Sequence, residues 1–134
     1  MLAVEALQAG YGAAPVLHDL SLGVARGQVT TLLGRNGMGK TTTVRAIMGL
    51  LRPSAGRISF QGRPIAGCKP EAIARLGLGL VPEGRQVFPT LTVRENLIAA
   101  ARPGPWSLPR IHALFPRLAE RARQRAATLS GGEQ

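Results

Sequence analysis

The fold of this chain is decided by one stretch, which reads Gly34-Arg35-Asn36-Gly37-Met38-Gly39-Lys40-Thr41. It matches the pattern G-x-x-x-x-G-K-[ST] without a gap, and its spacing excludes the dinucleotide pattern G-x-G-x-x-G. Glycines let successive backbone N–H groups converge on one anion, which side chains would obstruct. The lysine adds a mobile cation for phosphates, and the threonine adds a hydroxyl for Mg²⁺. The stretch therefore predicts a loop that holds the phosphates of a nucleotide.

The sequence on either side of this loop supports that prediction. Residues 28–33 are β-branched and apolar, and they predict a buried strand. Residues 40–51 place Val44, Ile47, Met48 and Leu51 on one face of a helix. A shuffled chain of this composition would match the motif roughly 0.3% of the time, so a chance match is a poor explanation.

Weaker patterns predict the other elements. Strands are expected at residues 2–9, 20–25, 57–60 and 78–81, with turns at residues 10–15 and 61–64. A helix is expected at residues 70–76, with proline in its first turn. Thr92 and Glu95 form a capping-box pattern that opens a helix to about residue 101. A loop at residues 102–109 and a helix at residues 111–118, broken at Pro116, complete the prediction.

Composition limits the classes of protein. The chain has 134 residues, enough for one small domain, and its 45% apolar content favours a packed core. No apolar run is long enough to span a membrane, the start has no basic leader, and the single Cys68 excludes an internal disulfide. The formal charge is +10, but the basic residues are scattered and aromatic residues are only 4%, which disfavours a nucleic-acid surface.

In a second motif, Leu129-Ser130-Gly131-Gly132-Glu133-Gln134, Ser130 lies 90 residues after Lys40. Alone the motif is an ordinary helix entry with serine at the N-cap. Together with the phosphate loop it resembles the signature motif of the nucleotide-binding domain of ATP-binding cassette (ABC) transporters. The resemblance implies that Ser130 and the amides of Gly131 and Gly132 face the γ-phosphate of an ATP held by a partner domain, in a head-to-tail dimer.

The resemblance implies an α/β fold of the P-loop NTPase class, with an N-terminal antiparallel β region and a helical subdomain. The expected division is residues 1–82 for the ATP-binding core and residues 83–134 for the helical part. Tyr11 matches the aromatic that stacks on adenine, and Glu83 stands where most members carry the glutamine of the Q-loop. Mg²⁺ would be held by Thr41, with Glu83 as a possible second ligand. The expected ATP-binding residues are Tyr11, Gly34, Arg35, Asn36, Gly37, Met38, Gly39, Lys40, Thr41 and Thr42.

Residues 81–97, together with Arg35 in the loop, look like the branch of the family that energises uptake of branched-chain amino acids. Urea-uptake ATPases are the main competing branch. The expected partners are a second ATPase subunit, membrane permease subunits and, indirectly, a periplasmic binding protein, with no nucleic acid. Residues 84–97, including Arg85 and Arg94, are expected to dock the permease. The expected location is cytoplasmic, at the inner face of the membrane.

The family's hydrolytic residues follow the signature motif, and none of them is found in this chain. The only aspartate, Asp19, lies near an early strand, and both histidines, His18 and His112, precede the signature. We therefore expect an N-terminal part of an ABC ATPase, truncated before the Walker B strand, with no catalytic residue. Such a part is expected to be poorly soluble or partly molten, to bind ATP weakly at best and to hydrolyse none.

Two other classes remain open. DNA-repair and chromosome-maintenance ATPases also pair a phosphate loop with a Ser-Gly-Gly motif, but they carry a coiled coil or zinc-binding insertion between the two. Here the interval shows no heptad run and has one cysteine. A small kinase or GTPase would explain the phosphate loop alone and leave the signature motif without a role.

Overall fold

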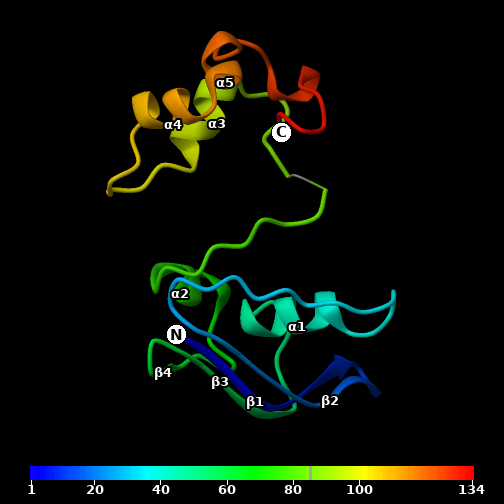
Figure 1. Cartoon of the computed structure of the whole chain (residues 1–134). Helices are drawn as coiled ribbons and strands as arrows, with labels where there is room; N and C mark the ends of the chain where they lie inside the picture. Colours follow the sequence, from blue (N-terminus) through cyan, green and yellow to red (C-terminus); the bar gives the residue numbers. More distant parts are fainter. Residues whose placement is uncertain (85) are drawn as a thin grey trace. The chain divides into compact units, whose positions relative to one another are not determined.

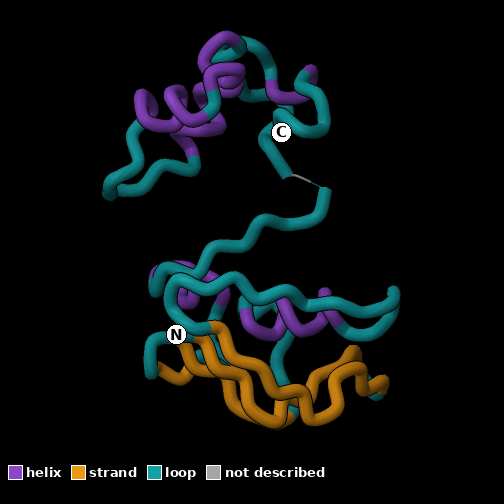
Figure 2. Tube along the Cα trace, viewed as in Figure 1, coloured by secondary structure: helices purple, strands orange, loops and turns teal. Residues whose placement is uncertain are grey.

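The computed structural model describes residues 1–84 and 86–134. The chain divides into two compact units, Met1–Leu80 and Val81–Gln134. The first unit contains a sheet with two helices, and the second contains short helices (Figures 1 and 2).

The sheet of the first unit has four antiparallel strands in the order β2-β1-β3-β4. Its strands are β1 (Leu2–Tyr11), β2 (Ala14–Val24), β3 (Ala55–Phe60) and β4 (Arg63–Pro64). The predicted strands at residues 2–9, 20–25 and 57–60 are confirmed. The second of them is longer than expected, because the hairpin turn is confined to Gly12 and Ala13 and pairing resumes at Ala14.

A bulge in β1 sets which side chains enter the core. The register with β2 shifts between Val4 and Leu7, where Ala6 has φ 48°. Side chains three residues apart would face opposite sides of a regular strand, but the extra residue brings both Val4 and Leu7 to the buried side. The core cluster consists of Val4, Leu7, Ala9, Leu17, Ala46, Ile58, Phe60, Ile65 and Ile73.

Helices α1 (Lys40–Ile47) and α2 (Pro70–Arg75) lie on one side of this sheet (Figure 1). The predicted helix at 70–76 is confirmed, with Ile73 fully buried. The predicted helix at 40–51 ends earlier, at Ile47. Its predicted apolar face is wrong in part: Met48 is buried, but Val44 is 38% exposed, and α1 buries Thr42, Thr43 and Ala46. The sheet contacts the face with the smallest side chains, which lets helix and sheet approach closely.

Two predicted buried strands are wrong. Residues 28–33 and 78–81 form no strand and are drawn as loop in Figure 2. Val29, Leu33 and Val81 are 96%, 85% and 94% exposed. A strand needs neighbours for its N–H and C=O groups, and among the described residues no other strand pairs with either segment.

The second unit is built around α3 (Val93–Ala99). Its predicted capping box is confirmed: Thr92 N–H donates to Glu95 Oε2 at 2.7 Å, and Glu95 N–H donates to Thr92 Oγ1 at 3.2 Å. The pKa of Glu95 is lowered by the two hydrogen bonds that Thr92 donates to its carboxylate, most strongly by the one from the Thr92 backbone and then by the one from its hydroxyl. The helix ends two residues before the expected position.

The next two helices of this unit each have a proline in their first turn. Pro116 separates α4 (Leu108–Leu114) from α5 (Pro116–Glu120), as predicted, although α4 begins inside the expected loop at residues 102–109. A 3₁₀ turn, η1 (Ala126–Thr128), follows. It is fixed to the start of α3 by the bridge between Thr92 and Arg125, and it precedes the Leu129–Gln134 motif.

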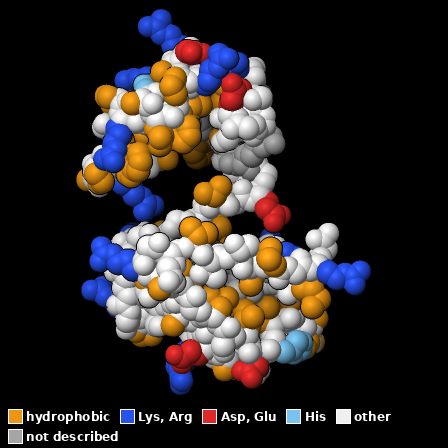
Figure 3. All heavy atoms as spheres, viewed as in Figure 1, with side chains coloured by type: hydrophobic (Ala, Val, Ile, Leu, Met, Phe, Trp, Pro, Cys, Tyr) orange, Lys and Arg blue, Asp and Glu red, His pale blue; other side chains and the backbone are white. Residues whose placement is uncertain are grey.

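On the face shown in Figure 3, Lys and Arg side chains are spread over both units. No helix within residues 1–84 and 86–134 has the length and apolar character needed to cross a bilayer.

Candidate functional site

The 34–41 loop leads directly into α1. Gly37 and Gly39 have φ 85° and 84°, a left-handed conformation that L side chains rarely adopt. Gly39 is also the N-cap residue and is buried, and a Cβ there would lie 2.6 Å from Leu17 Cδ2. Both the backbone angle and the space therefore require glycine where the loop becomes helix.

The start of α1 is open to an anion. No side chain within the described part of the chain caps this helix, whose first turn also lacks an acidic residue. The first N–H groups of a helix have no acceptor within it, and the helix dipole places partial positive charge there. A carboxylate cap would compete with phosphate, and this site has none.

Lys40 is folded back over the loop. Its Nζ donates to the carbonyl oxygens of Gly34 and Arg35, at 2.6 and 2.8 Å. The ammonium is thus held beside the loop amides by two backbone carbonyls. This geometry fits the binding of phosphate oxygens, because the cation and the helix N-terminus lie at the same loop.

The candidate metal ligands are fewer than a cation requires. Thr41 is exposed at the start of α1, whereas Thr43 is buried and donates its hydroxyl to the Gly39 carbonyl at 2.9 Å. Within residues 1–84 and 86–134, no group of three or more His, Cys, Asp or Glu side chains is arranged to hold a metal. Glu83 is exposed and belongs to the second unit. An Mg²⁺ ion bound between nucleotide phosphates takes most of its oxygen ligands from phosphates and water, so a single hydroxyl from Thr41 would suit it.

Tyr11 ends β1 and is 46% exposed. Its phenol oxygen accepts a hydrogen bond from Arg45 Nη1 at 3.2 Å. Hydrogen bonds with Thr42 and with Arg45, in that order of strength, lower the pKa of this phenol. Thr42 and Arg45 both belong to α1, so the predicted adenine-stacking residue is linked to the helix that begins at the phosphate loop.

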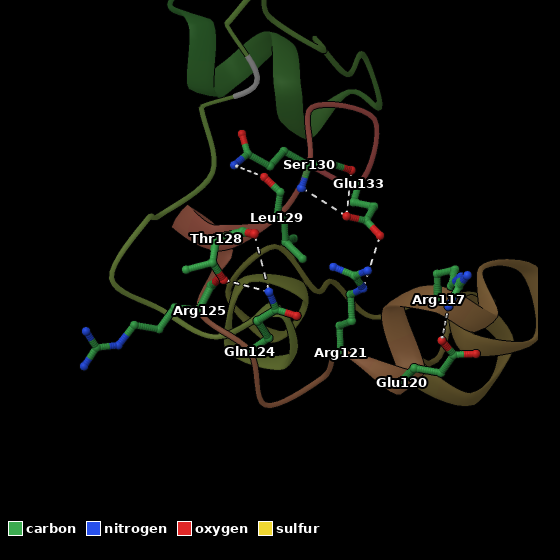
Figure 4. Close-up of polar contacts among 10 residues, drawn as sticks. Arg117, Glu120, Arg121, Gln124, Arg125, Thr128, Leu129, Ser130 and Glu133 are labelled. Carbon is green, nitrogen blue, oxygen red and sulfur yellow. Dashed lines mark hydrogen bonds and ion pairs between the residues drawn. The ribbon is translucent and has the colours of Figure 1, made fainter.

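The second motif folds into a single turn in the other unit (Figure 4). The Ser130 hydroxyl and backbone N–H both donate to Glu133 Oε2, at 2.7 and 3.0 Å. The Gln134 side chain donates to the carbonyl oxygens of Ala126 and Leu129. Gly131 and Gly132 are exposed. The motif thus presents two exposed glycines on a turn that is fixed from both ends.

Arg121 stabilises this turn from α5's C-terminal end. Its Nε lies 3.2 Å from Glu133 Oε1, and the two side chains are 35% and 20% exposed (Figure 4). The pKa of Glu133 is lowered by the hydrogen bonds from Ser130 first, and then by the charges of Arg121 and Arg117.

Sequence reasoning missed Arg45 and Arg121. The helical spacing of Thr42 and Arg45 was visible, since residues three apart share a helix face. Spacing along the sequence could not show that this face of α1 lies against Tyr11 at the end of β1. Arg85 was named with Arg94 for permease docking, and it lies outside the described residues. Arg94 is exposed, and its N–H donates to the Ala122 carbonyl at 3.0 Å.

The sequence that contains the phosphate loop and the signature turn matches a known family. A family profile described as ABC transporter covers residues 17–134. The chain belongs to the ABC transporter family. The ATPase domains of this family bind and hydrolyse ATP. They dimerise and work with membrane permease subunits.

Curated relatives include both importers and exporters. The chain is 39% identical to the high-affinity branched-chain amino acid transport ATP-binding protein BraG of Pseudomonas aeruginosa, over 100% of this chain and 60% of that protein. It is 39% identical to the Nod factor export ATP-binding protein I of Paraburkholderia xenovorans, over 96% of this chain and 43% of that protein. It is 37% identical to the autoinducer 2 import ATP-binding protein LsrA of an Enterobacter species, over 85% of this chain and 22% of that protein.

Solved structures with the same fold are ATPase domains. An ATP-binding subunit of an ABC transporter aligns with a TM-score of 0.81 and 36% identity, over 98% of this chain and 56% of that one. A nucleotide-free ATP-binding cassette aligns with a TM-score of 0.80 and 27% identity, over 98% and 60%. The expected α/β, P-loop NTPase fold is confirmed. The chain spans 60% or less of the length of each of these relatives.

Proposed function

We propose that this chain carries the ATP-binding part of an ABC importer whose cargo is branched-chain amino acids. The phosphate loop supports ATP binding, because its glycine angles, uncapped helix start and inward-turned Lys40 suit a triphosphate. The similarity to BraG along the whole chain supports branched-chain amino acids as the cargo. Urea or another amide or amino acid is the alternative cargo.

The proposed roles follow the residues of the two units. In the first unit, residues 34–42 hold the phosphates, Thr41 offers a hydroxyl to Mg²⁺, and Tyr11 stacks on adenine. Bound Mg²⁺ would neutralise charge on the phosphate oxygens. In the second unit, Ser130 with Gly131 and Gly132 closes over the nucleotide of a partner subunit, and Glu83 takes the Q-loop position. No hydrolytic residue is assigned to these 134 residues.

The proposed partners are a second ATPase subunit and integral permease subunits, with a periplasmic binding protein acting through the permease. Residues 84–97 are the proposed permease contact, and Arg94 is exposed there. This places the protein at the inner face of the plasma membrane. The DNA-repair class is disfavoured, because the curated relatives described above are transport proteins.

Uptake of labelled leucine tests the cargo. Deletion of the native gene should abolish high-affinity leucine uptake, and the intact gene should restore it, while urea uptake stays unchanged. Loss of urea uptake with normal leucine uptake would replace the branched-chain assignment with the alternative. Salt-dependent binding of DNA by the purified product would instead support the DNA-repair class.

A further inference from the structure

We propose that Arg45 is a positioning residue that holds the Tyr11 ring for the nucleotide base and ties it to the helix that carries the phosphate loop. This inference rests on the proposed function, namely phosphate binding at residues 34–42 and base stacking by Tyr11. It adds a residue to which neither motif assigns a role, and it explains how the base end and the phosphate end of the site stay in register.

The contact that carries this inference is the hydrogen bond from Arg45 Nη1 to the Tyr11 phenol oxygen, at 3.2 Å. Tyr11 is the last residue of β1, directly before the two-residue turn. A ring at such a hairpin end has little packing around it, and at 46% exposure it would sample several rotamers if nothing held its hydroxyl. A donor on the hydroxyl fixes one end of the ring and leaves its face free to stack.

Thr42 strengthens the same arrangement. It is buried at 5% exposure, and its hydrogen bond is the main cause of the lowered pKa of Tyr11, followed by that of Arg45. Residues three apart on a helix lie on one side of it, so Thr42 and Arg45 share the side of α1 from which Arg45 reaches the phenol. The geometric contact is therefore that of Arg45, and Thr42 acts on the pKa of the same phenol from the same helix.

The same helix begins at the phosphate loop, since α1 starts at Lys40. Arg45 lies five residues later, about 7.5 Å along the helix axis. A helix of this length is stiff, so the phosphate-binding end and the base-binding tyrosine move as one body. Because binding energy depends on groups that are already in place, this coupling should raise affinity for a nucleotide and not for its phosphate chain alone.

The first test compares ATP with inorganic tripolyphosphate, which lacks the base, on the native gene product. We expect Arg45→Met to weaken ATP binding about five-fold, the loss typical of one hydrogen bond, and to leave tripolyphosphate binding unchanged. Arg57→Met is the matched control. It removes the same charge from the same unit, where Arg57 pairs with Glu5 on the sheet, and it should change neither affinity.

A double-mutant cycle isolates the pair. In a Tyr11→Phe background the hydroxyl is absent, and Arg45→Met should then have no further effect on ATP binding. Equal loss of ATP and tripolyphosphate affinity in Arg45→Met would overturn the inference, since the arginine would then act on the phosphate loop. An ATP affinity equal to that of the native protein would also overturn it.

The phenol provides a readout that does not depend on nucleotide. Subtracting the ultraviolet titration of Tyr11→Phe from that of the native protein isolates the Tyr11 phenol. Arg45→Met should raise its pKa toward the ordinary tyrosine value, and Arg57→Met should not. An unchanged pKa would mean that the contact does not form. If the native product binds neither ATP nor tripolyphosphate, the proposed function fails first, and this inference fails with it.

Discussion

Glu133 is the one acidic residue of the Leu129–Gln134 motif. It accepts from the hydroxyl and the N–H of Ser130 and pairs with Arg121. Its pKa is lowered in the folded chain, so its ionised form stabilises the fold above the unfolded pKa. That contribution is lost as the pH falls through the lowered pKa.

Ser130→Ala should therefore raise the pKa of Glu133 toward its ordinary value, because the strongest hydrogen bond to the carboxylate is removed. Carboxyl ¹³C NMR titration measures this shift. Ser107→Ala is the control: Ser107 caps α4 by accepting from the Arg110 N–H and has no contact with Glu133. A Glu133 pKa that stays low without the Ser130 hydroxyl would contradict this geometry.

Single residues were predictable where a motif fixes their chemistry. The spacing of the loop predicted Lys40 and Thr41 at the start of a helix, and the structure places both there. The roles assigned to them stay predictions. Arg45 and Arg121 were not predictable, because each acts through a contact with a residue far away in the sequence, Tyr11 and Glu133.

Elements were predictable where the signal is local. The Thr92–Glu95 capping box and the proline that opens α2 depend on neighbouring residues, and both predictions are confirmed. The predicted strand at residues 28–33 is wrong because its apolar composition says nothing about a pairing partner. Composition predicts a strand only when another segment supplies the hydrogen bonds.

The exposure of residues 28–33 gives a stability prediction. Leu33 is 85% exposed, so Leu33→Ser should change the free energy of unfolding of these 134 residues by less than about 0.5 kcal/mol. Leu7→Ala is the positive control, because Leu7 is fully buried and its truncation should cost about 2–5 kcal/mol. Urea unfolding measures both. A cost above about 2 kcal/mol for Leu33→Ser would mean that this segment is a buried strand after all.

At the scale of the whole molecule, the sequence predicted the family fold from two motifs, at residues 34–41 and 129–134, and that prediction is confirmed. It did not predict the β1 bulge that turns both Val4 and Leu7 into the core, because a bulge changes register without changing composition. It also did not predict which face of α1 meets the sheet. Those features depend on packing between segments far apart in the chain.

The central claim is that the 34–41 loop binds the phosphates of ATP, and equilibrium binding of MgATP to the native gene product tests it most directly. The chain contains only two lysines, Lys40 and Lys69, which provide a matched pair of variants. We expect Lys40→Ala to weaken binding about 10- to 100-fold, because charge-assisted hydrogen bonds to phosphate are lost. Lys69→Ala, at the exposed start of α2, should bind as the native protein does. An unchanged MgATP affinity in Lys40→Ala would contradict the claim.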